Sequence, residues 1–233
     1  MSTTAVFGCT GLVGSNVLST LLAVDSCATV PTISRRAPKT TGAKLQAIIE
    51  PETNQWADKL TALTPPPTTV ISALGTTRAA AGGIANQWKI DHDLNVELAQ
   101  AAKARGVRNF VFVSSAGTRG MLSARAPYSR MKIGVEDSIK DLGFEQAVIL
   151  RPGLILGERE GSNILGGFLN TLLHGFGRIV GQGAKDAIGQ EADVIARAAV
   201  HAARITEEGR APSKYWVVEA ADIVRLGRTE WVG

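Results

Sequence analysis

Two side chains in the middle of the chain are spaced so that they could deliver a proton to a polarised group. Tyr128 and Lys132 are four residues apart, so on a helix they share one face. Ser115 lies thirteen residues before Tyr128, just after a strand predicted over residues 109–114. In the reduction of a carbonyl group, Tyr128 would donate the proton, the charge of Lys132 would lower the pKa of the tyrosine, and Ser115 would hydrogen-bond the carbonyl oxygen. Alone the pattern has low specificity, because a surface tyrosine packed along a lysine stem has the same spacing.

A glycine-rich turn near the N-terminus strengthens this interpretation. Residues 8–14 read Gly-Cys-Thr-Gly-Leu-Val-Gly, directly after a strand predicted over residues 4–7 and at the start of a helix predicted over 12–22. Glycine allows a sharp turn and lets a pyrophosphate approach the backbone, while the helix N-terminus offers free N–H groups and a partial positive charge. In this strand–turn–helix context the pattern predicts a dinucleotide site, and Lys132 would then hold the nicotinamide ribose. The expected contacts of the turn are Gly8, Thr10, Gly11, Leu12, Val13 and Gly14.

The end of the second predicted strand indicates which dinucleotide binds. An NAD site places Asp or Glu there to hold the ribose 2′-hydroxyl. This chain instead has Ser34, Arg35 and Arg36 at the end of a strand predicted over residues 28–34, and its next acidic residue is Glu50. Two guanidinium groups beside a hydroxyl suit the 2′-phosphate of NADP(H). An arginine pair on a solvated loop without a ligand would give the same sequence. We therefore expect NADP(H).

The three histidines are poorer candidates for chemistry. His92 lies between Asp91 and Asp93 on a predicted long helix, and we expect this charged face to be solvated. His174 and His201 have no cysteine or carboxylate partners at the spacing of metal ligands. No metal site is therefore expected.

The elements that would position these groups alternate between short apolar runs and longer helical patterns, which is typical of a parallel sheet covered by helices. Strands are predicted over residues 4–7, 28–34, 45–49, 69–73, 109–114 and 145–150, with a short last strand over 215–218. Helices are predicted over residues 12–22, 55–63, 85–105, 128–140 and 192–204. We therefore expect an α/β fold, with a Rossmann-type doubly wound, mainly parallel sheet of six to seven strands and helices on both faces. The length of 233 residues suits one domain over residues 1–233.

A glycine-dotted segment at about 158–189 is expected to lie on the substrate side of this domain. It carries apolar residues at near-helical spacing, namely Ile164, Leu165, Phe168, Leu172, Leu173 and Phe176. Such a stripe fits core packing, a pocket wall, a dimer contact or a membrane-surface contact. Its spacing alone does not choose among the four, and the sequence does not indicate an oligomeric state.

The composition excludes several classes of protein. The chain has 25 basic and 21 acidic residues, without the dense basic run or reading motif that a nucleic-acid binder would show. Two cysteines are too few for a disulfide framework. No apolar run reaches the length of a membrane span, so we expect a soluble or peripheral intracellular protein with a small-molecule substrate.

Over essentially its whole length the chain resembles the atypical short-chain dehydrogenase/reductases. Within that group it looks closest to the fungal Rossmann-type proteins of the mitochondrial outer membrane, which are related to the animal Tat-interacting oxidoreductase-like protein. The segment 75–78 (Gly-Thr-Thr-Arg) is the most telling shared piece. The other matching pieces are the turn at 8–14, the strand and serines at 109–115, residues 128–132, and the Leu-Arg-Pro-Gly segment at 150–153.

This resemblance implies further roles. Leu74, Gly75 and Thr76 would pass close to the pyrophosphate and ribose of the cofactor, and Arg78 would reach toward phosphate or substrate. Ser114 would also contact the cofactor, and Pro152, Gly153 and Leu154 would border the nicotinamide. The resemblance also implies peripheral attachment to the cytosolic face of the mitochondrial outer membrane. It supports an NADPH-dependent oxidoreductase, and it leaves open an NADP(H)-binding regulator or scaffold with little or no turnover.

Overall fold

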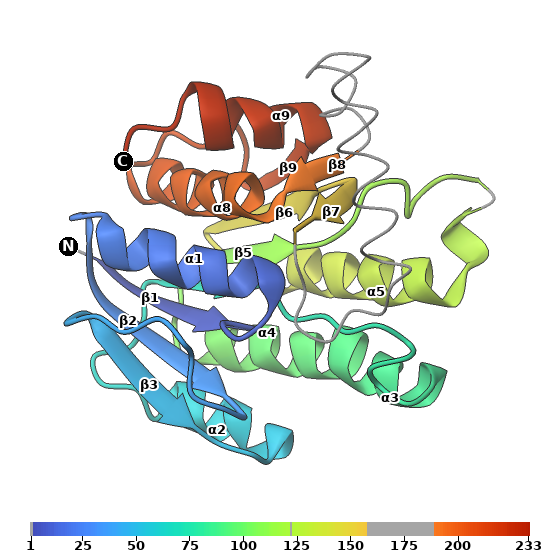
Figure 1. Cartoon of the computed structure of the whole chain (residues 1–233), viewed down its shortest axis with the longest axis horizontal. Coiled ribbons are helices and arrows are strands. Elements are labelled where there is room, and N and C mark those ends of the chain that lie inside the picture. The colour runs from blue at the N-terminus through green and yellow to red at the C-terminus, as the bar shows by residue number, and fades with distance from the viewer. Residues whose placement is uncertain (1, 122, 158–188) are drawn as a thin grey trace.

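The computed structural model describes residues 2–121, 123–157 and 189–233, and these form a parallel sheet between two layers of helices (Figure 1). The sheet has seven strands in the order β3-β2-β1-β4-β5-β6-β9, and every neighbouring pair is parallel. The chain order reverses between β1 and β4, which is where doubly wound sheets bind ligands. The expected fold class is confirmed. The strands are β1 Ser2–Phe7, β2 Cys27–Ser34, β3 Leu45–Ile49, β4 Thr69–Ser72, β5 Asn109–Val113, β6 Gln146–Arg151 and β9 Tyr215–Glu219.

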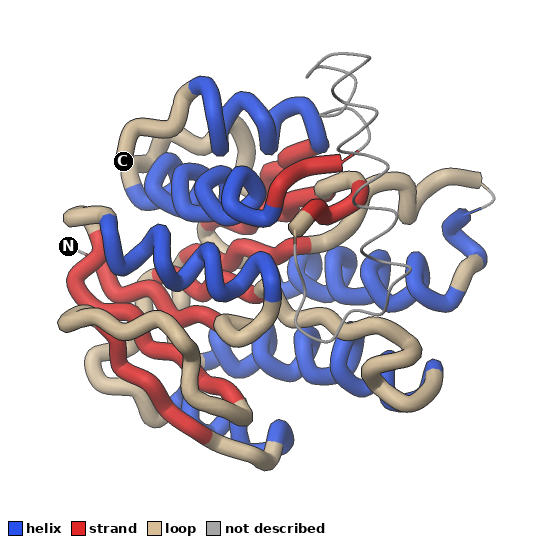
Figure 2. Tube along the Cα trace, in the orientation of Figure 1, coloured by secondary structure: helices blue, strands red, loops and turns tan. Residues whose placement is uncertain are grey.

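Helices cover both faces of the sheet (Figure 2). One face carries α1 Leu12–Ala23 and α8 Ala192–Glu207, which pack against each other. The other face carries α2 Trp56–Thr61, α4 Leu94–Ala104 and α5 Pro127–Leu142. Because the sheet is buried on both sides, its central strands are almost continuously apolar, and all five residues of β5 are buried.

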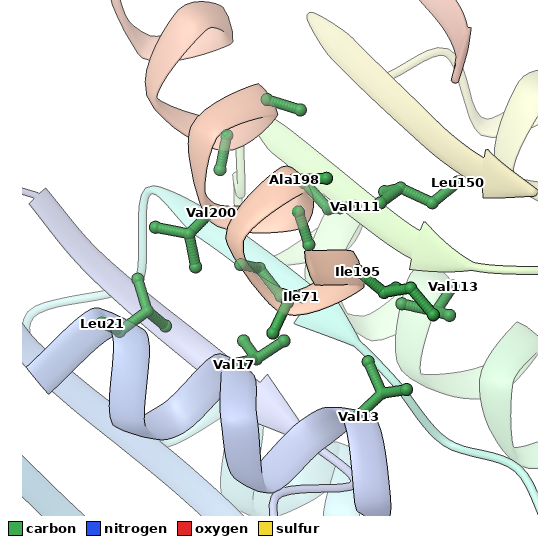
Figure 3. Packing of buried hydrophobic residues seen from close by; sticks show 14 of the residues in the cluster. Val13, Val17, Leu21, Ile71, Val111, Val113, Leu150, Ile195, Ala198 and Val200 are labelled. Carbon is green, nitrogen blue, oxygen red and sulfur yellow. The ribbon is translucent and has the colours of Figure 1, made fainter. Parts of the chain in front are cut away.

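A cluster of aliphatic side chains joins α1, α8 and the centre of the sheet (Figure 3). Val13, Val17 and Leu21 recur along one face of α1 and meet Ile195 and Ala198 of α8. This packing fixes where the first turn of α1 lies relative to the carboxyl ends of β1 and β4.

The long helix predicted over residues 85–105 is interrupted. It consists of α3 Ile84–Trp88, a π-helical turn η2 Lys89–Asp93, and α4. The side-chain amide of Asn95 donates to the backbone oxygens of Ile90 and Asp91, and accepts a hydrogen bond from Ser72 at 2.7 Å. A π turn inserts one residue, so it changes which side chains face the sheet.

Two pairs of short elements were not predicted from the sequence. Beside the main sheet, β7 Leu154–Leu156 and β8 Gly189–Glu191 form a two-stranded parallel sheet. Three-residue strands are too short to show an alternating pattern. The chain was also expected to finish with the strand at 215–218, which is wrong, because α9 Ala220–Val224 and the π turn η4 Arg225–Thr229 follow β9 and pack on α8. Short 3₁₀ turns occur at η1 Thr53–Gln55 and η3 Ser123–Arg125.

Residues 158–188 lie outside the described residues, and so does the apolar stripe that the sequence places there. Among the helices that are described, none is long and apolar enough to cross a membrane.

Candidate functional site

The glycine turn lies at the point where the strand order reverses. Gly8 has a φ of +81°, and a Cβ there would stand 2.7 Å from the backbone of Ala73, just after β4. A Cβ on Gly14 would stand 2.0 Å from the carbonyl oxygen of Gly8. The N–H of Gly11 donates to that same oxygen at 2.9 Å. The turn is therefore packed so closely on α1 and the end of β4 that only glycine fits at its first and last positions.

The first turn of α1 can receive an anion. It carries no acidic side chain, and the N-cap Gly11 makes no side-chain cap. The first backbone N–H groups of a helix have no acceptor within the helix, and its dipole favours negative charge there. Thr10 and Gly11 are exposed, and Leu12 is half-buried. These residues fit the pyrophosphate of a dinucleotide, which binds through backbone N–H groups beside a surface without bulky side chains.

The segment expected to select the cofactor ends β2. The Ser34 hydroxyl is buried and donates to the carbonyl oxygen of Arg36 at 2.8 Å, which folds the chain back just after the strand. Arg35 and Arg36 are both exposed. The serine therefore shapes the loop, while the two guanidinium groups extend into solvent.

The loop after β4 passes beside the turn. Leu74 is buried, whereas Gly75 and Arg78 are exposed. The backbone of Thr76 is held from the interrupted helix, because the Gln87 side chain donates to its oxygen at 3.2 Å. The segment that the resemblance assigns to cofactor contacts is thus fixed next to the glycine turn.

Lys132 is the most enclosed of the three predicted catalytic residues. Proline at the first position of α5 costs no helical hydrogen bond, and Lys132 lies one turn and a half further on. Its side chain is 5 % exposed. The ammonium group donates to the carbonyl oxygen of Val113 at 3.3 Å and lies 4.8 Å from the centre of the Phe112 ring. Burial lowers the pKa of Lys132, although the carboxylates of Asp91 and Glu136 act in the opposite direction.

Tyr128 and Ser115 are more open to solvent. Tyr128 is in the first turn of α5 and is 40 % exposed. Ser115 is half-buried in the loop after β5, where its hydroxyl lies 3.5 Å from the carbonyl oxygen of Ala116. The fold thus brings all three predicted residues to the carboxyl end of β5 or to the helix that follows it. Their catalytic roles remain predictions.

The preceding serine has a different environment. Ser114 is buried, and its hydroxyl donates to the Glu136 carboxylate at 2.6 Å. Its N–H donates to the oxygen of Leu150 on β6. The side chain of Ser114 is therefore bound to α5 and its N–H to β6, so only its backbone carbonyl is left for the cofactor contact that the resemblance implies.

A buried charge cluster behind the site was missed by the sequence analysis. Glu136 has no exposed surface, and its carboxylate accepts hydrogen bonds from Arg151 at 2.6 and 3.2 Å and from Arg119 at 3.0 Å, besides that of Ser114. Burial raises the pKa of Glu136, but the hydrogen bonds from Arg151, Ser114 and Arg119 outweigh it, so the net pKa is lowered. Arg151 also pairs with Glu219 on β9 at 3.0 Å. The available signal was the position of Glu136 one turn after Lys132, on the face of α5 that packs inward.

The expectation that the charged face around His92 is solvated is wrong for Asp91. Asp91 is 1 % exposed, and its carboxylate accepts a hydrogen bond from the N–H of Thr76 at 2.9 Å. The other carboxylate oxygen lies 4.0 Å from the ammonium nitrogen of Lys132. His92 and Asp93 do reach the surface, where they contact each other. The prediction assumed a regular helix, and the π turn of η2 moves Asp91 to the inner side.

The expected border of the nicotinamide follows β6. Pro152 is buried and Leu154 is exposed, and the N–H of Gly153 donates to the side-chain oxygen of Gln190 at 2.7 Å. Gln190 belongs to β8, so this hydrogen bond links the segment after β6 to the small second sheet. In the described part of the chain, no group of three or more His, Cys, Asp or Glu side chains could hold a metal ion.

Comparison with known proteins identifies the class. The model of the NAD dependent epimerase/dehydratase family matches residues 4–217. The chain therefore belongs to this family, which agrees with the reductase-type Rossmann fold expected from the sequence and supports a nicotinamide dinucleotide as the cofactor.

Similar proteins are found in fungi. The chain is 61% identical over 235 residues to "Protein FMP52, mitochondrial" of Chaetomium globosum, with 99% of each chain covered. It is 60% identical to "Protein fmp-52, mitochondrial" of Neurospora crassa, covering 99% of this chain and 97% of that protein. The expected similarity to fungal mitochondrial proteins is confirmed.

Solved structures share the fold at low identity. MoeE5 in complex with UDP-glucose and NAD has a TM-score of 0.63 and 18% identity, over 97% of this chain and 81% of that chain. The UDP-N-acetylglucosamine 4-epimerase from Methanobrevibacter ruminantium M1, in complex with UDP-N-acetylmuramic acid, has a TM-score of 0.67 and 17% identity, over 94% and 76% respectively.

Proposed function

We propose that the chain is an NADPH-dependent reductase that converts a carbonyl to the corresponding alcohol, or reduces a similarly polarised group. The observation that carries the proposal is the position of Lys132, enclosed against the end of β5 and one helical turn from Tyr128, on the strand edge where the glycine turn also lies. A nicotinamide dinucleotide supplies the hydride in such a reaction. The family membership supports this cofactor class.

The protein side chains would supply the proton and the orientation. Tyr128 would donate its phenolic proton to the oxygen of the carbonyl as the carbon receives the hydride, and it would recover a proton from solvent, to which it is open. The positive charge of Lys132 stabilises the phenolate that this transfer creates. Ser115 would hold the carbonyl oxygen with its hydroxyl. The product is the alcohol, together with the oxidised cofactor.

A substrate panel with NADPH tests this function. We expect the purified protein to oxidise NADPH in the presence of at least one aldehyde, ketone or quinone, as followed by the loss of NADPH absorbance. Binding of NADPH without oxidation by any of the three classes would reject the reductase and favour the regulatory or scaffold alternative. Absence of NADPH binding would reject both.

The cofactor preference rests on the two exposed arginines after β2. Replacing Arg35 and Arg36 together by alanine should weaken NADPH binding by about 100-fold or more, because each charge-assisted hydrogen bond to a phosphate contributes about 1.5–3 kcal/mol. NADH, which has no 2′-phosphate, should lose little affinity. Both dissociation constants can be measured by titration calorimetry.

Arg108→Ala is the matched control for this pair. Arg108 is also exposed, but it precedes β5 and so lies at the opposite edge of the sheet. We expect this variant to bind both cofactors as the wild type does. An equal loss of NADPH and NADH affinity in the double variant would contradict the proposed recognition of the 2′-phosphate.

The proposed location is the cytosolic face of the mitochondrial outer membrane, with peripheral attachment. The names of the fungal relatives, which call those proteins mitochondrial, support the organelle. A tagged chain should be extracted from isolated mitochondria by alkaline carbonate and degraded by external protease. Resistance to protease with the outer membrane intact would contradict this location.

A further inference from the structure

The buried carboxylate of Asp91 faces the same ammonium group on which the proposed function depends. Oδ1 of Asp91 lies 4.0 Å from Nζ of Lys132, and both side chains are within the protein. Oδ2 accepts the N–H of Thr76 at 2.9 Å. One carboxylate therefore contacts both the loop after β4 and the lysine of α5.

Several contacts hold Asp91 in this position. The π turn η2 directs it inward, and the side chain of Asn95 stabilises the turn by donating to the backbone oxygens of Ile90 and Asp91. Gly75 lies directly over the ion pair, because a Cβ there would stand 3.2 Å from Oδ1 of Asp91 and 3.8 Å from Nζ of Lys132. An ordinary side chain at position 75 would thus press on the carboxylate.

Two carboxylates lie near Lys132, and they are not equivalent. Glu136, on the same helix, already accepts hydrogen bonds from Arg151, Arg119 and Ser114, so its charge is shared with two guanidinium groups. Asp91 approaches from η2 and is in direct ion-pair range of the ammonium group.

Among the residues that the structure describes, the other neighbours of Lys132 do not provide a counter-charge. From β5 they are the carbonyl oxygen of Val113 and the ring of Phe112. Tyr128, one turn earlier on α5, is a phenol and not a carboxylate. Asp91 is therefore the principal source of negative charge for the buried ammonium.

We propose that Asp91 is a positioning residue that acts as the counter-ion of Lys132, keeps its ammonium group charged at the site, and ties it to the loop after β4. This proposal deepens the proposed function and rests on it for the catalytic consequence. The ion pair itself exists whether or not the protein turns over a substrate. A charged Lys132 can stabilise a phenolate on Tyr128, whereas a neutral amine cannot.

The ionisation of Lys132 in the cofactor-free protein gives a direct test. The Cε resonances of ¹³C-labelled lysines report the protonation of each ammonium group, and Lys132→Met assigns the relevant signal. Removal of an opposite charge within about 4–6 Å shifts a pKa by about one unit or more. We therefore expect Asp91→Asn to move the titration midpoint of Lys132 downward by at least about one pH unit, because the uncharged amide no longer offsets the effect of burial.

Asp93→Asn is the matched control. Asp93 is two residues away on the same turn, but its side chain is exposed and contacts His92. Its removal should leave the midpoint of Lys132 unchanged. A midpoint that is the same in Asp91→Asn and in the wild type would overturn the proposal.

Gly75→Ala provides a second variant if Asp91→Asn does not fold. Its methyl group should displace the carboxylate without removing it, so the midpoint should also fall, by a smaller amount. No shift in a folded Gly75→Ala protein would count against the ion pair.

The proposed reductase function is tested separately, by the rate of NADPH oxidation. If any carbonyl substrate is turned over, the rate of Asp91→Asn should fall below that of the wild type at pH values between the two titration midpoints of Lys132, where only the wild type still carries the ammonium charge. If the midpoint shifts and no variant oxidises NADPH, the role of Asp91 as counter-ion stands and the reductase function is rejected.

Discussion

Replacing Tyr128 by phenylalanine should reduce the rate of NADPH oxidation by about 10²–10⁴-fold, the usual contribution of a positioned proton donor. The change removes one oxygen from a side chain that is 40 % exposed, so the fold should be retained. NADPH affinity should stay within a few fold of the wild type, because the proposed role of the phenol is in the reaction and not in cofactor binding. Steady-state rates with the best substrate of the panel, and NADPH titrations on the same samples, measure both quantities.

Tyr215→Phe is the natural control, since the chain contains two tyrosines. The Tyr215 hydroxyl donates to the backbone oxygen of Glu136 at 3.3 Å, away from the open edge of the site. Its loss should have little effect on turnover. Full activity in Tyr128→Phe would show that another group donates the proton.

Replacing Glu136 by alanine should lower the free energy of unfolding by about 3–5 kcal/mol, the usual cost of removing one partner from a buried ion pair. The variant leaves Arg151 without its buried carboxylate and removes the acceptor of the Ser114 hydroxyl. Urea denaturation at neutral pH measures this loss. Asp137→Asn is the control, because Asp137 also pairs with Arg119 but is half exposed, and surface pairs contribute about 0–1 kcal/mol.

The same carboxylate makes stability depend on pH in a defined direction. The net pKa of Glu136 is lowered in the folded protein, so its contribution is present above the unfolded value of about 4.3 and is lost as the pH falls through the folded value. Wild type should therefore lose its advantage over Glu136→Ala in acid. An advantage that is constant down to the acid transition would contradict the assigned charge state.

Much of the fold follows from patterns that the sequence carries locally. Apolar runs such as β5 are long enough to identify buried parallel strands, and the glycines of the turn are required by contacts between residues close in sequence, such as Gly14 with Gly8. The predicted site, from the glycine turn to Lys132, lies at the carboxyl ends of the strands, which is where doubly wound sheets bind ligands. The observed order β3-β2-β1-β4-β5-β6 is the one usual for doubly wound folds.

The parts that could not be predicted depend on contacts between distant elements. A regular helix places Asp91 beside two other polar residues on a charged face, and only the π turn, stabilised by Asn95 and Ser72, brings it inside. The role of Ser114 likewise depends on Glu136, which lies on another element. Single residues of this kind have no periodic signal, because their partners are defined by the packing of the sheet and not by the chain nearby.

The pairing of Arg151 with two carboxylates affects which parts of the protein unfold together in local fluctuations. Its guanidinium joins Glu136 of α5 to Glu219 of β9, and β9 is the outermost strand on its side of the sheet. An outer strand would ordinarily be among the first segments to detach in local fluctuations. Here its release breaks the Arg151–Glu219 ion pair and also the hydrogen bond from the Tyr215 hydroxyl of β9 to the backbone oxygen of Glu136 on α5, the helix that carries Tyr128 and Lys132. The C-terminal edge and the proposed reaction centre therefore form one cooperative unit, and hydrogen exchange in β9 should follow that of α5.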